Sequence, residues 1–210
     1  MLTLYKANRS GNCYKVELFL GMNAIPYDIE LVDVLNRANQ TPAFEEISAF
    51  QQVPALRDND DFIWDSQAIL VHLAGRYAPH WMPEAKSIAH SHMHEWLSVA
   101  ANEIANSLQP MRLVHLIGLH EAAHHMNVAQ SLFDVEGCQR RCDRVLTRMN
   151  KRLDGQPWLA GEQPSIADIA CYPYTSLAHQ GKVQMESYPA VRRWTERFAR
   201  LPGFTPIDPR

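Results

Sequence analysis

The chain has 210 residues, and its 20 lysines and arginines against 23 aspartates and glutamates give a formal net charge of −3. Hydrophobic residues make up 46% and charged residues 20%, which excludes disordered, collagen-like and low-complexity chains. The lack of a basic excess argues against binding to duplex nucleic acid. Four cysteines over this length do not make a disulfide scaffold, so we expect free thiols in a reducing compartment.

The sequence predicts neither an export signal nor a membrane span. The first residues turn polar after Tyr5, which leaves no apolar stretch of the length that a signal peptide needs. The most apolar early segment, 16–27, contains Asn23 and Pro26 and is too short to cross a bilayer. We therefore expect a cytoplasmic protein with no membrane partner.

The first part of the chain alternates the patterns of strands and helices. A strand is expected over 2–5, a helix over 14–22 and a half-buried strand with period-two alternation over 27–32. This is a β-α-β unit, whose strands pair in parallel through a right-handed crossover. A short amphipathic helix is expected next, over 42–50.

Two short strand candidates, at 55–57 and 62–64, flank a cluster of Asp and Asn residues that suits a hairpin turn. A helix over 66–77 follows, with its apolar residues on one face. The order of elements in residues 1–78 is therefore βαβαββα, and we predict an α/β domain there.

The strand patterns end at residues 79–86, a stretch with two prolines that we interpret as a linker. Beyond it, apolar residues recur every three or four positions, which is typical of amphipathic helices. Helices are predicted over residues 93–111, 126–153, 165–178 and 189–201. Residues 87–210 are therefore expected to form an all-α bundle.

The first candidate site lies in the loop before the first helix, which reads RSGNC over residues 9–13. A helix N-terminus presents unpaired N–H groups and a partial positive charge, which lower the pKa of a thiol held there. Ser10 stands where thioredoxin-type enzymes place the first cysteine of Cys-x-x-Cys, so two-cysteine redox chemistry is disfavoured. Its hydroxyl suits a hydrogen bond to a thiolate brought by a ligand. The alternative is that Ser10 only caps the helix.

A second motif precedes the third strand candidate, where Val53 is followed by Pro54. In this context the proline predicts a cis peptide bond, which would turn the Val53 backbone outward to pair with a peptide-like ligand. The alternative is an ordinary proline at the start of a strand.

A third motif, Asp65-Ser66, lies where a strand ends and a helix begins. A hydroxyl and free N–H groups at a helix start suit a carboxylate, and an aspartate beside them suits an ammonium group. Together they predict a site for an α-amino-acid head, with a simple helix cap as the alternative. Further along, Ser165 and Asp168 have the spacing of a capping box and are interpreted as structural.

Several reactive side chains receive a structural interpretation. The ten histidines include His90 and His94 on one helix face, but without a third converging ligand we expect no metal site. Cys13 is expected one turn into its helix and is not the expected nucleophile. Arg9 and Lys15 are interpreted as structural or solvated.

Taken together, these motifs make the chain resemble the glutathione S-transferase family. The resemblance covers nearly the whole chain, from the Ser10 loop through Val53-Pro54 and Asp65-Ser66 to the helical half with its box at 158–168. The pattern Arg-Ser-x-x-x-x-Lys-Val is most similar to the serine-type theta and zeta classes and their bacterial relatives. The resemblance implies a thioredoxin-like N-terminal domain that binds glutathione, an all-α domain that supplies an electrophile pocket, and a homodimer.

The resemblance also implies a role for individual residues. Ser10 would hydrogen-bond the glutathione sulfur, and Asn12 is its competitor for that role. The other implied glutathione contacts are the Val53 backbone for the cysteinyl unit, Asp65 and Ser66 for the γ-glutamyl head, and Gln51 or Gln52 for the glycine end. The implied electrophile pocket is lined by Tyr14, Leu108, Met111, Arg112 and His115.

Physical chemistry supports this way of activating the thiol. A free thiol of this kind has a pKa of about 8.5. Lowering it by roughly two units requires about 2.7 kcal/mol. One charge-assisted hydrogen bond contributes about 1.5–3 kcal/mol, and a helix N-terminus contributes about 0.3–1 kcal/mol. We therefore expect glutathione as co-substrate, with no metal and no general base.

The expected function is that of a glutathione transferase acting on a small electrophile. Dehalogenation, isomerisation and the reduction of a disulfide or peroxide by glutathione are alternatives at the same site. A non-catalytic binding or scaffold protein is the alternative from another class. Such proteins typically lose the loop serine and the acid-serine pair, both of which are present here as Ser10 and Asp65-Ser66.

Overall fold

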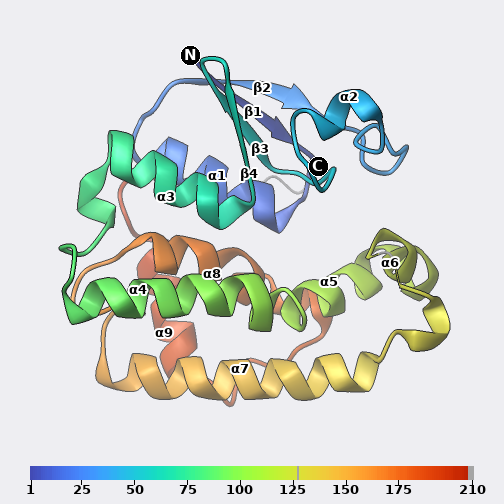
Figure 1. The fold of residues 1–210 in the computed structure, drawn as a ribbon. Coiled ribbons are helices and arrows are strands. Elements are labelled where there is room, and N and C mark those ends of the chain that lie inside the picture. Colours follow the sequence, from blue (N-terminus) through green and yellow to red (C-terminus); the bar gives the residue numbers. More distant parts are fainter. Residues whose placement is uncertain (127, 208–210) are drawn as a thin grey trace. The chain divides into compact units, whose positions relative to one another are not determined.

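The computed structural model describes residues 1–126 and 128–207 (Figure 1). The chain folds into two units, one made of Met1–Met82 with Ala199–Arg210 and the other of Pro83–Phe198. The predicted span of the helical domain, 87–210, reaches into residues that lie outside the described ones. Within the described residues, no helix is long and apolar enough to cross a membrane.

The first unit is built on a four-stranded sheet with the strand order β2-β1-β3-β4. Its strands are β1 (Leu2–Lys6), β2 (Tyr27–Leu31), β3 (Ala55–Asp58) and β4 (Asp61–Trp64). β1 pairs in parallel with β2 and antiparallel with β3, and β3 pairs antiparallel with β4. The predicted β-α-β unit and the hairpin are therefore both confirmed.

Three α-helices complete the predicted order βαβαββα in this unit: α1 (Gly11–Met22), α2 (Pro42–Glu45) and α3 (Ser66–Tyr77). Figure 1 shows α1 and α3 side by side on one face of the sheet. Leu4 and Leu56 of the sheet, Phe19 of α1 and Ile69 of α3 are fully buried, and they form the thioredoxin-like core.

One expectation for the first unit is wrong. β2 is not half-buried, because Ile29 and Leu31 are exposed and the strand is held by its pairing with β1. The boundary between the two units, at 82/83, falls within the predicted linker 79–86, whose first residues form a short 3-10 helix, η1 (Pro79–Trp81), in the first unit. The indole Nε1 of Trp81 donates a hydrogen bond to Asn23 Oδ1 at 2.9 Å. This bond attaches η1 to the end of α1.

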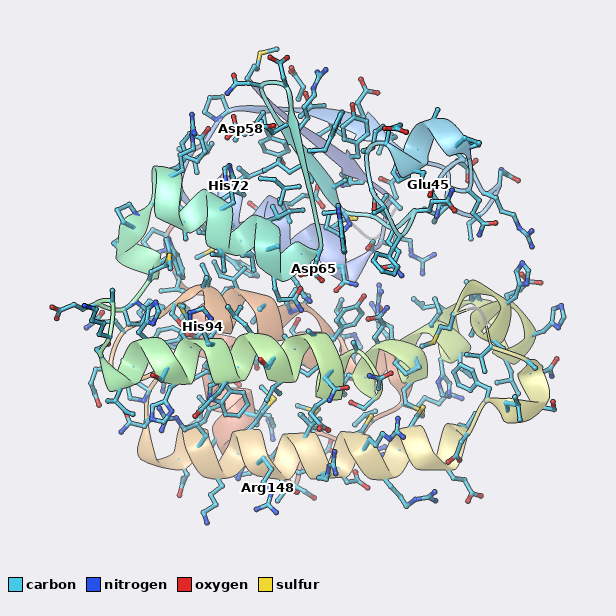
Figure 2. The ribbon with its side chains drawn as sticks, viewed as in Figure 1. Glu45, Asp58, Asp65, His72, His94 and Arg148 are labelled. Atoms are coloured by element: carbon cyan, nitrogen blue, oxygen red, sulfur yellow. The ribbon has the colours of Figure 1, made fainter. Side chains whose placement is uncertain are left out.

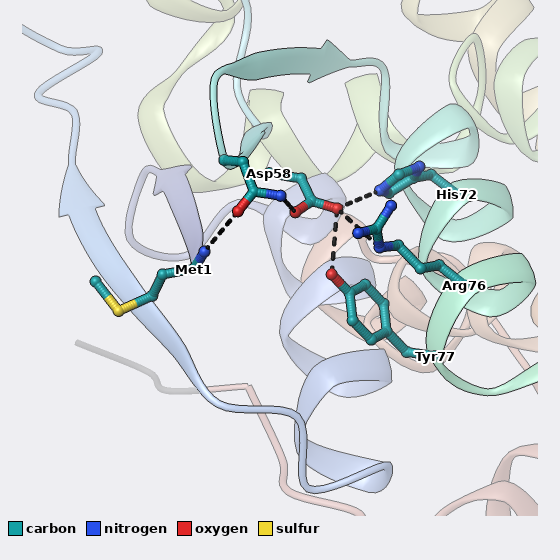
Figure 3. A network of polar contacts seen from close by, with 6 residues as sticks. Met1, Asp58, His72, Arg76 and Tyr77 are labelled. Atoms are coloured by element: carbon teal, nitrogen blue, oxygen red, sulfur yellow. Dashed lines mark hydrogen bonds and ion pairs between the residues drawn. The ribbon is translucent and has the colours of Figure 1, made fainter.

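A polar network attaches the β3–β4 hairpin to the end of α3 (Figure 3). Asp58 Oδ2 lies 2.8 Å from His72 Nε2, accepts a hydrogen bond from the Tyr77 hydroxyl at 3.2 Å and lies 3.5 Å from Arg76 Nε. Burial by itself would raise the pKa of Asp58, but the bonds from His72 and Tyr77 and the charge of Arg76 outweigh it and lower the pKa below its usual value.

In the part of the second unit that the structure describes, the regular elements are all helical, as predicted. Its helices are α4 (Ile88–Val99), the π-helical η2 (Ala100–Ile104), α5 (Leu108–Ile117), α6 (Leu119–His125), the 3-10 helix η3 (Gln130–Leu132), α7 (Val135–Gly155), α8 (Ile166–Ser176), the 3-10 helix η4 (Ala178–Gly181) and α9 (Pro189–Phe198). The chain therefore combines an α/β domain with an all-α bundle.

Two of the long helices that the sequence predicts are divided in the structure. The helix expected over 93–111 breaks after η2, and α5 begins anew with Pro110 in its first turn, where the missing N–H of proline interrupts no hydrogen bond. The helix expected over 126–153 begins only at α7, after the Asp134 cap. Apolar residues recur at helical spacing on both sides of each break, so the sequence pattern did not indicate that the helices end there.

The capping box that starts α8 is confirmed. Asp168 is fully buried and accepts hydrogen bonds from the backbone N–H groups of Leu159 and Ser165 at 3.0 and 2.9 Å and from the indole N–H of Trp194 at 2.9 Å. Burial raises the pKa of Asp168 to about 6, although these hydrogen bonds act in the opposite direction. The carboxylate therefore organises the core of the second unit.

Residues 199–207 belong to the first unit and not to the helical bundle to which the sequence assigned them. The helix expected to reach Leu201 ends at Phe198. Gly203 has a φ of 74°, and a Cβ there would lie 2.7 Å from the Met22 Cα. The segment therefore approaches the end of α1 more closely than any side chain would allow.

Candidate functional site

The pairing of the strands brings three sequence motifs to one edge of the sheet. Tyr5 pairs with Ala55, and Ala55 pairs with Trp64, so these residues form a row across β1, β3 and β4. At this row β1 leads into the Ser10 loop, the Val53-Pro54 step enters β3, and β4 ends before Asp65. Figure 2 shows Asp65 at the junction of β4 and α3.

Ser10 occupies the N-cap of α1. Its Oγ accepts a hydrogen bond from the backbone N–H of Cys13 at 3.3 Å. A serine hydroxyl has two acceptor positions and one O–H. The cap uses an acceptor position, which leaves the O–H for a partner outside the helix. Capping and donation to a ligand sulfur are therefore compatible roles for the same side chain.

Cys13 is the third residue of α1, and its side chain is fully buried. Burial raises the pKa of its thiol to about 11, more than the nearby Ser10 hydroxyl and Ala7 backbone lower it. A thiol with this pKa is protonated at neutral pH and is a poor nucleophile. The expectation that Cys13 is not the reacting thiol agrees with this environment. Asn12, beside it in the first turn, is half-buried.

A cavity of about 240 Å³ lies in the first unit beside the start of α1. Ser10, Tyr14 and Thr205 are among the residues that line it. Tyr14 is buried, and its hydroxyl donates a hydrogen bond to the Thr205 carbonyl oxygen at 2.6 Å. The Tyr14 side chain, which was expected to line an electrophile pocket, is therefore tied to the C-terminal segment.

The Val53-Pro54 bond is cis, as predicted, and the pairing of β3 begins two residues after Val53, at Ala55. Before it, Gln51 is held from several sides. Its side-chain Nε2 donates to the Thr41 carbonyl at 3.2 Å, and its own carbonyl accepts from Asn39 Nδ2 at 2.6 Å. Gln52, by contrast, has an exposed side chain.

Asn39 lies beside Gln51 without any signal in the sequence that predicts it. Besides its bond to Gln51, its Oδ1 is buried and has no hydrogen-bond partner among the described residues. A buried acceptor without a partner is uncommon in a folded protein. Its place beside Gln51 comes from a loop that lies 12 residues earlier in the chain, so no local sequence pattern could have indicated it.

Asp65 is the N-cap of α3 and has a strained backbone, with a φ of 69° and a ψ of 123°. Its Oδ1 accepts hydrogen bonds from the N–H groups of Gln67 and Ala68 at 2.9 and 3.1 Å. Such a conformation costs on the order of 1–3 kcal/mol for a residue other than glycine and concentrates at functional sites. The Asp65 carboxylate is exposed, whereas the neighbouring Ser66 is buried.

Lys15 connects α1 to the start of α3. Its side chain is 1% exposed, and its Nζ donates a hydrogen bond to Ser66 Oγ at 3.4 Å. Of the two interpretations of Lys15, structural or solvated, the structural one is therefore correct. The one available signal was its position between Tyr14 and Val16, in the buried part of α1.

The four other residues expected at an electrophile pocket lie on α5 of the second unit. Leu108 and Met111 are buried. Arg112 is also buried, and its Nε donates to Gln180 Oε1 at 2.7 Å. His115 is exposed, with its Nδ1 at 2.8 Å from the Met111 carbonyl. The Arg112 charge is thus held by a neighbour in its own unit.

The two histidines on α4 contact each other, and His94 is exposed. The rings of His90 and His94 stack edge to face with centroids 4.7 Å apart. Among the residues that the structure describes, no group of three or more His, Cys, Asp or Glu side chains could hold a metal ion.

Comparisons with known proteins cover both units. Models of the N-terminal and C-terminal domains of glutathione S-transferases match residues 4–81 and 112–202. The disulfide-bond oxidoreductase YfcG of Escherichia coli (strain K12) is 30% identical, over 97% of this chain and 92% of its own. Glutathione S-transferase theta-3 of Mus musculus is 27% identical, over 93% and 81%. The crystal structure of a glutathione S-transferase from Pseudomonas fluorescens superposes with a TM-score of 0.86 at 30% identity, covering 98% of each chain.

Proposed function

The chain belongs to the glutathione S-transferase family, and we propose that this glutathione transferase binds glutathione at the sheet edge formed by the Ser10 loop, Val53 and Asp65-Ser66. There it activates the thiol as a thiolate for attack on a small electrophile. The observation that carries the proposal is the row Tyr5–Ala55–Trp64, which gathers the three motifs at one edge.

Ser10 donates its O–H to the glutathione sulfur while its oxygen continues to cap α1. Ser10 already accepts a hydrogen bond from the Cys13 N–H, and this acceptor role supports donation of its O–H to a ligand. One such bond to a charged sulfur contributes about 1.5–3 kcal/mol, enough to move a thiol pKa by one to two units. Asn12 is the alternative donor, because its amide lies in the same helical turn.

The remaining contacts follow from the charges and backbone groups at the same edge. Asp65 binds the γ-glutamyl ammonium group, and Ser66 with the α3 N-terminus binds the α-carboxylate. Val53 pairs with the cysteinyl unit through its backbone. Of the two glutamines, Gln52 is the better candidate for the glycine end, because the amide of Gln51 is bound to Thr41.

Reduction of disulfides by glutathione is the second candidate function. The 30% identical relative YfcG is named a disulfide-bond oxidoreductase. Cys13 is buried, and its raised pKa disfavours a protein thiolate. In this reaction two glutathione molecules would be oxidised to glutathione disulfide while the substrate disulfide is reduced to two thiols. The Ser10 loop would stabilise the attacking glutathione thiolate as in conjugation.

We further propose a cytoplasmic homodimer that acts in detoxification. The four free cysteines are consistent with a reducing compartment. Two exposed aromatic side chains, Phe50 and Trp64, lie with their ring centroids 5.1 Å apart on the first unit and offer an apolar patch to a second copy. Sedimentation measures this directly, and a concentration-independent mass of 24.0 kDa would exclude the dimer.

Titration with glutathione by calorimetry is the first test of the proposed function. We expect one glutathione site per chain, followed by turnover with at least one member of a panel of aryl halides, epoxides, isomerisable acids, hydroperoxides and mixed disulfides. Activity with the disulfides alone would favour the reductase. A wild-type protein that binds no glutathione would contradict the proposal and favour a scaffold role.

A further inference from the structure

Lys15 is a buried charged group to which the function above assigns no role. Of the described residues, Lys15 and Arg112 are the buried cationic side chains. A buried ammonium group loses its hydration and is retained only where nearby groups compensate it. The Lys15 Nζ lies 3.4 Å from Ser66 Oγ, at the start of a different helix.

The hydrogen bonds of Ser66 have a direction that Lys15 imposes. An ammonium group donates and never accepts, so Ser66 Oγ must be the acceptor toward Lys15. The single O–H of Ser66 then has to point elsewhere. In this structure it points to Gln67 Oε1, an acceptor oxygen on the next residue. A ligand carboxylate is an acceptor of the same kind and can replace Gln67.

We propose that Lys15 is a positioning residue for glutathione: it orients the Ser66 hydroxyl toward the α-carboxylate of the γ-glutamyl head and supplies the positive charge for it. This inference rests on the proposed glutathione site. Asp65 by itself would repel that carboxylate, since like charges at close range disfavour binding. With Lys15 behind Ser66, the site holds one negative and one positive charge, which complement the ammonium and carboxylate groups of the ligand.

With Asp65 for the ammonium group and Lys15 for the carboxylate, the site is selective for a zwitterionic α-amino-acid head. Two tripeptide analogues separate its halves. In 4-aminobutyryl-cysteinyl-glycine the α-carboxylate is missing, and in glutaryl-cysteinyl-glycine the α-ammonium is missing. Lys15 acts on the carboxylate, so its removal should affect glutathione and the glutaryl peptide but not the 4-aminobutyryl peptide.

The test is calorimetric titration of wild type and Lys15→Met with glutathione and both analogues. We expect Lys15→Met to weaken glutathione binding about tenfold, as for loss of a hydrogen bond supported by charge, and to leave the affinity for the 4-aminobutyryl peptide unchanged. At saturating glutathione, kcat should change less than twofold. Lys151→Met, which removes an exposed lysine of α7, is the matched control and should match wild type.

A double-mutant cycle tests whether Lys15 acts through Ser66. Once Ser66→Ala has removed the hydroxyl, adding Lys15→Met should weaken glutathione binding by less than it does alone. Lys15→Gln, which loses the charge and keeps a donor, replaces Lys15→Met if circular dichroism shows that the methionine variant is unfolded. Additive losses, or equal losses with glutathione and the 4-aminobutyryl peptide, would overturn the inference and leave the proposed function intact. A wild type without glutathione binding overturns both.

Discussion

The two units begin their helices with the same capping side chains, and the comparison separates structural caps from those at the site. Ser10 and Asp65 cap α1 and α3 in the first unit, while Ser87 and Asp134 cap α4 and α7 in the second. In each pair a side-chain oxygen accepts from backbone N–H groups. The first pair alone follows strands that meet at one edge of a sheet. Position in the sheet, and not residue type, distinguishes a candidate binding group from a cap.

Residues with a strained backbone are also distributed unevenly between the two units. Most of the non-glycine residues with positive φ in the described part of the chain belong to the first unit, and three of them, Arg9, Gln51 and Asp65, adjoin the three motifs of the candidate site. Among the described residues of the second unit there are two, Lys86 and Lys182. Arg9, Gln51 and Asp65 therefore have an unfavourable backbone conformation at the edge of the sheet that carries the candidate site.

The largest effect on stability is expected in the second unit, at Asp168. Asp168→Ala leaves the N–H groups of Leu159, Ser165 and Trp194 buried without their acceptor and should lower the free energy of unfolding by about 3–5 kcal/mol. Denaturant unfolding measures this. The glutathione affinity of the folded Asp168→Ala protein should equal that of wild type. A lower affinity would show that this substitution in the second unit also affects the candidate site of the first.

The carboxyl group of Asp168 also makes the stability of the protein depend on pH, with a defined sign. Its pKa is raised from 3.8 to about 6 on folding, so its stabilising contribution is complete below pH 4 and is lost as the pH rises through 6. Wild type should therefore lose stability over this interval relative to Asp168→Asn, which cannot titrate. If the free energy of unfolding changed with pH in the same way for wild type and Asp168→Asn, the raised pKa of Asp168 would be contradicted.

The next largest effect is expected at Ser10. Ser10→Ala should lower glutathione-dependent turnover at least tenfold, because the thiolate loses a hydrogen bond. Ser87→Ala is the matched control, since it removes an equivalent serine cap from α4 and costs a comparable 0.5–2 kcal/mol or so of stability. Unchanged turnover in Ser10→Ala would transfer the role to Asn12, which Asn12→Ala then tests.

A smaller effect on affinity is expected at Asp65. Asp65→Ala should raise the dissociation constant of glutathione more than it lowers kcat, because the carboxylate binds the γ-glutamyl ammonium group and not the sulfur. Asp134→Ala, the matched aspartate cap on α7, should leave the constant unchanged. An unaltered glutathione affinity in Asp65→Ala would reduce Asp65 to the capping role that it shares with Asp134.

The smallest effect is expected from the network around Asp58, which lies in the first unit at the opposite end of β3 from the candidate site. Asp58→Asn should lower the free energy of unfolding at pH 7 by about 1–2 kcal/mol. The folded-state pKa of Asp58 is depressed, so its contribution is present above about pH 4 and is lost as the pH falls through the folded pKa. The two proteins should therefore converge in strong acid, and a constant difference would contradict this.

Local signals explain what could be predicted. The order βαβαββα came from periodicity and turn residues, the cis bond from Val53-Pro54, and the α8 start from the spacing of Ser165 and Asp168. Each of these depends on residues close together in the chain. The same local reasoning failed where apolar periodicity ran across a break, as it did before Pro110 in the helix expected over 93–111.

The sequence by itself determined the family, the order of elements and the three motifs of the candidate site, because these depend on residue type and short spacing. Only the tertiary structure decided which groups meet. Lys15 reaches Ser66 across 51 residues, Tyr14 reaches Thr205 across 191, and Asn39 holds Gln51. Hydrogen bonds between distant segments are set by strand register and helix packing, which local periodicity does not encode.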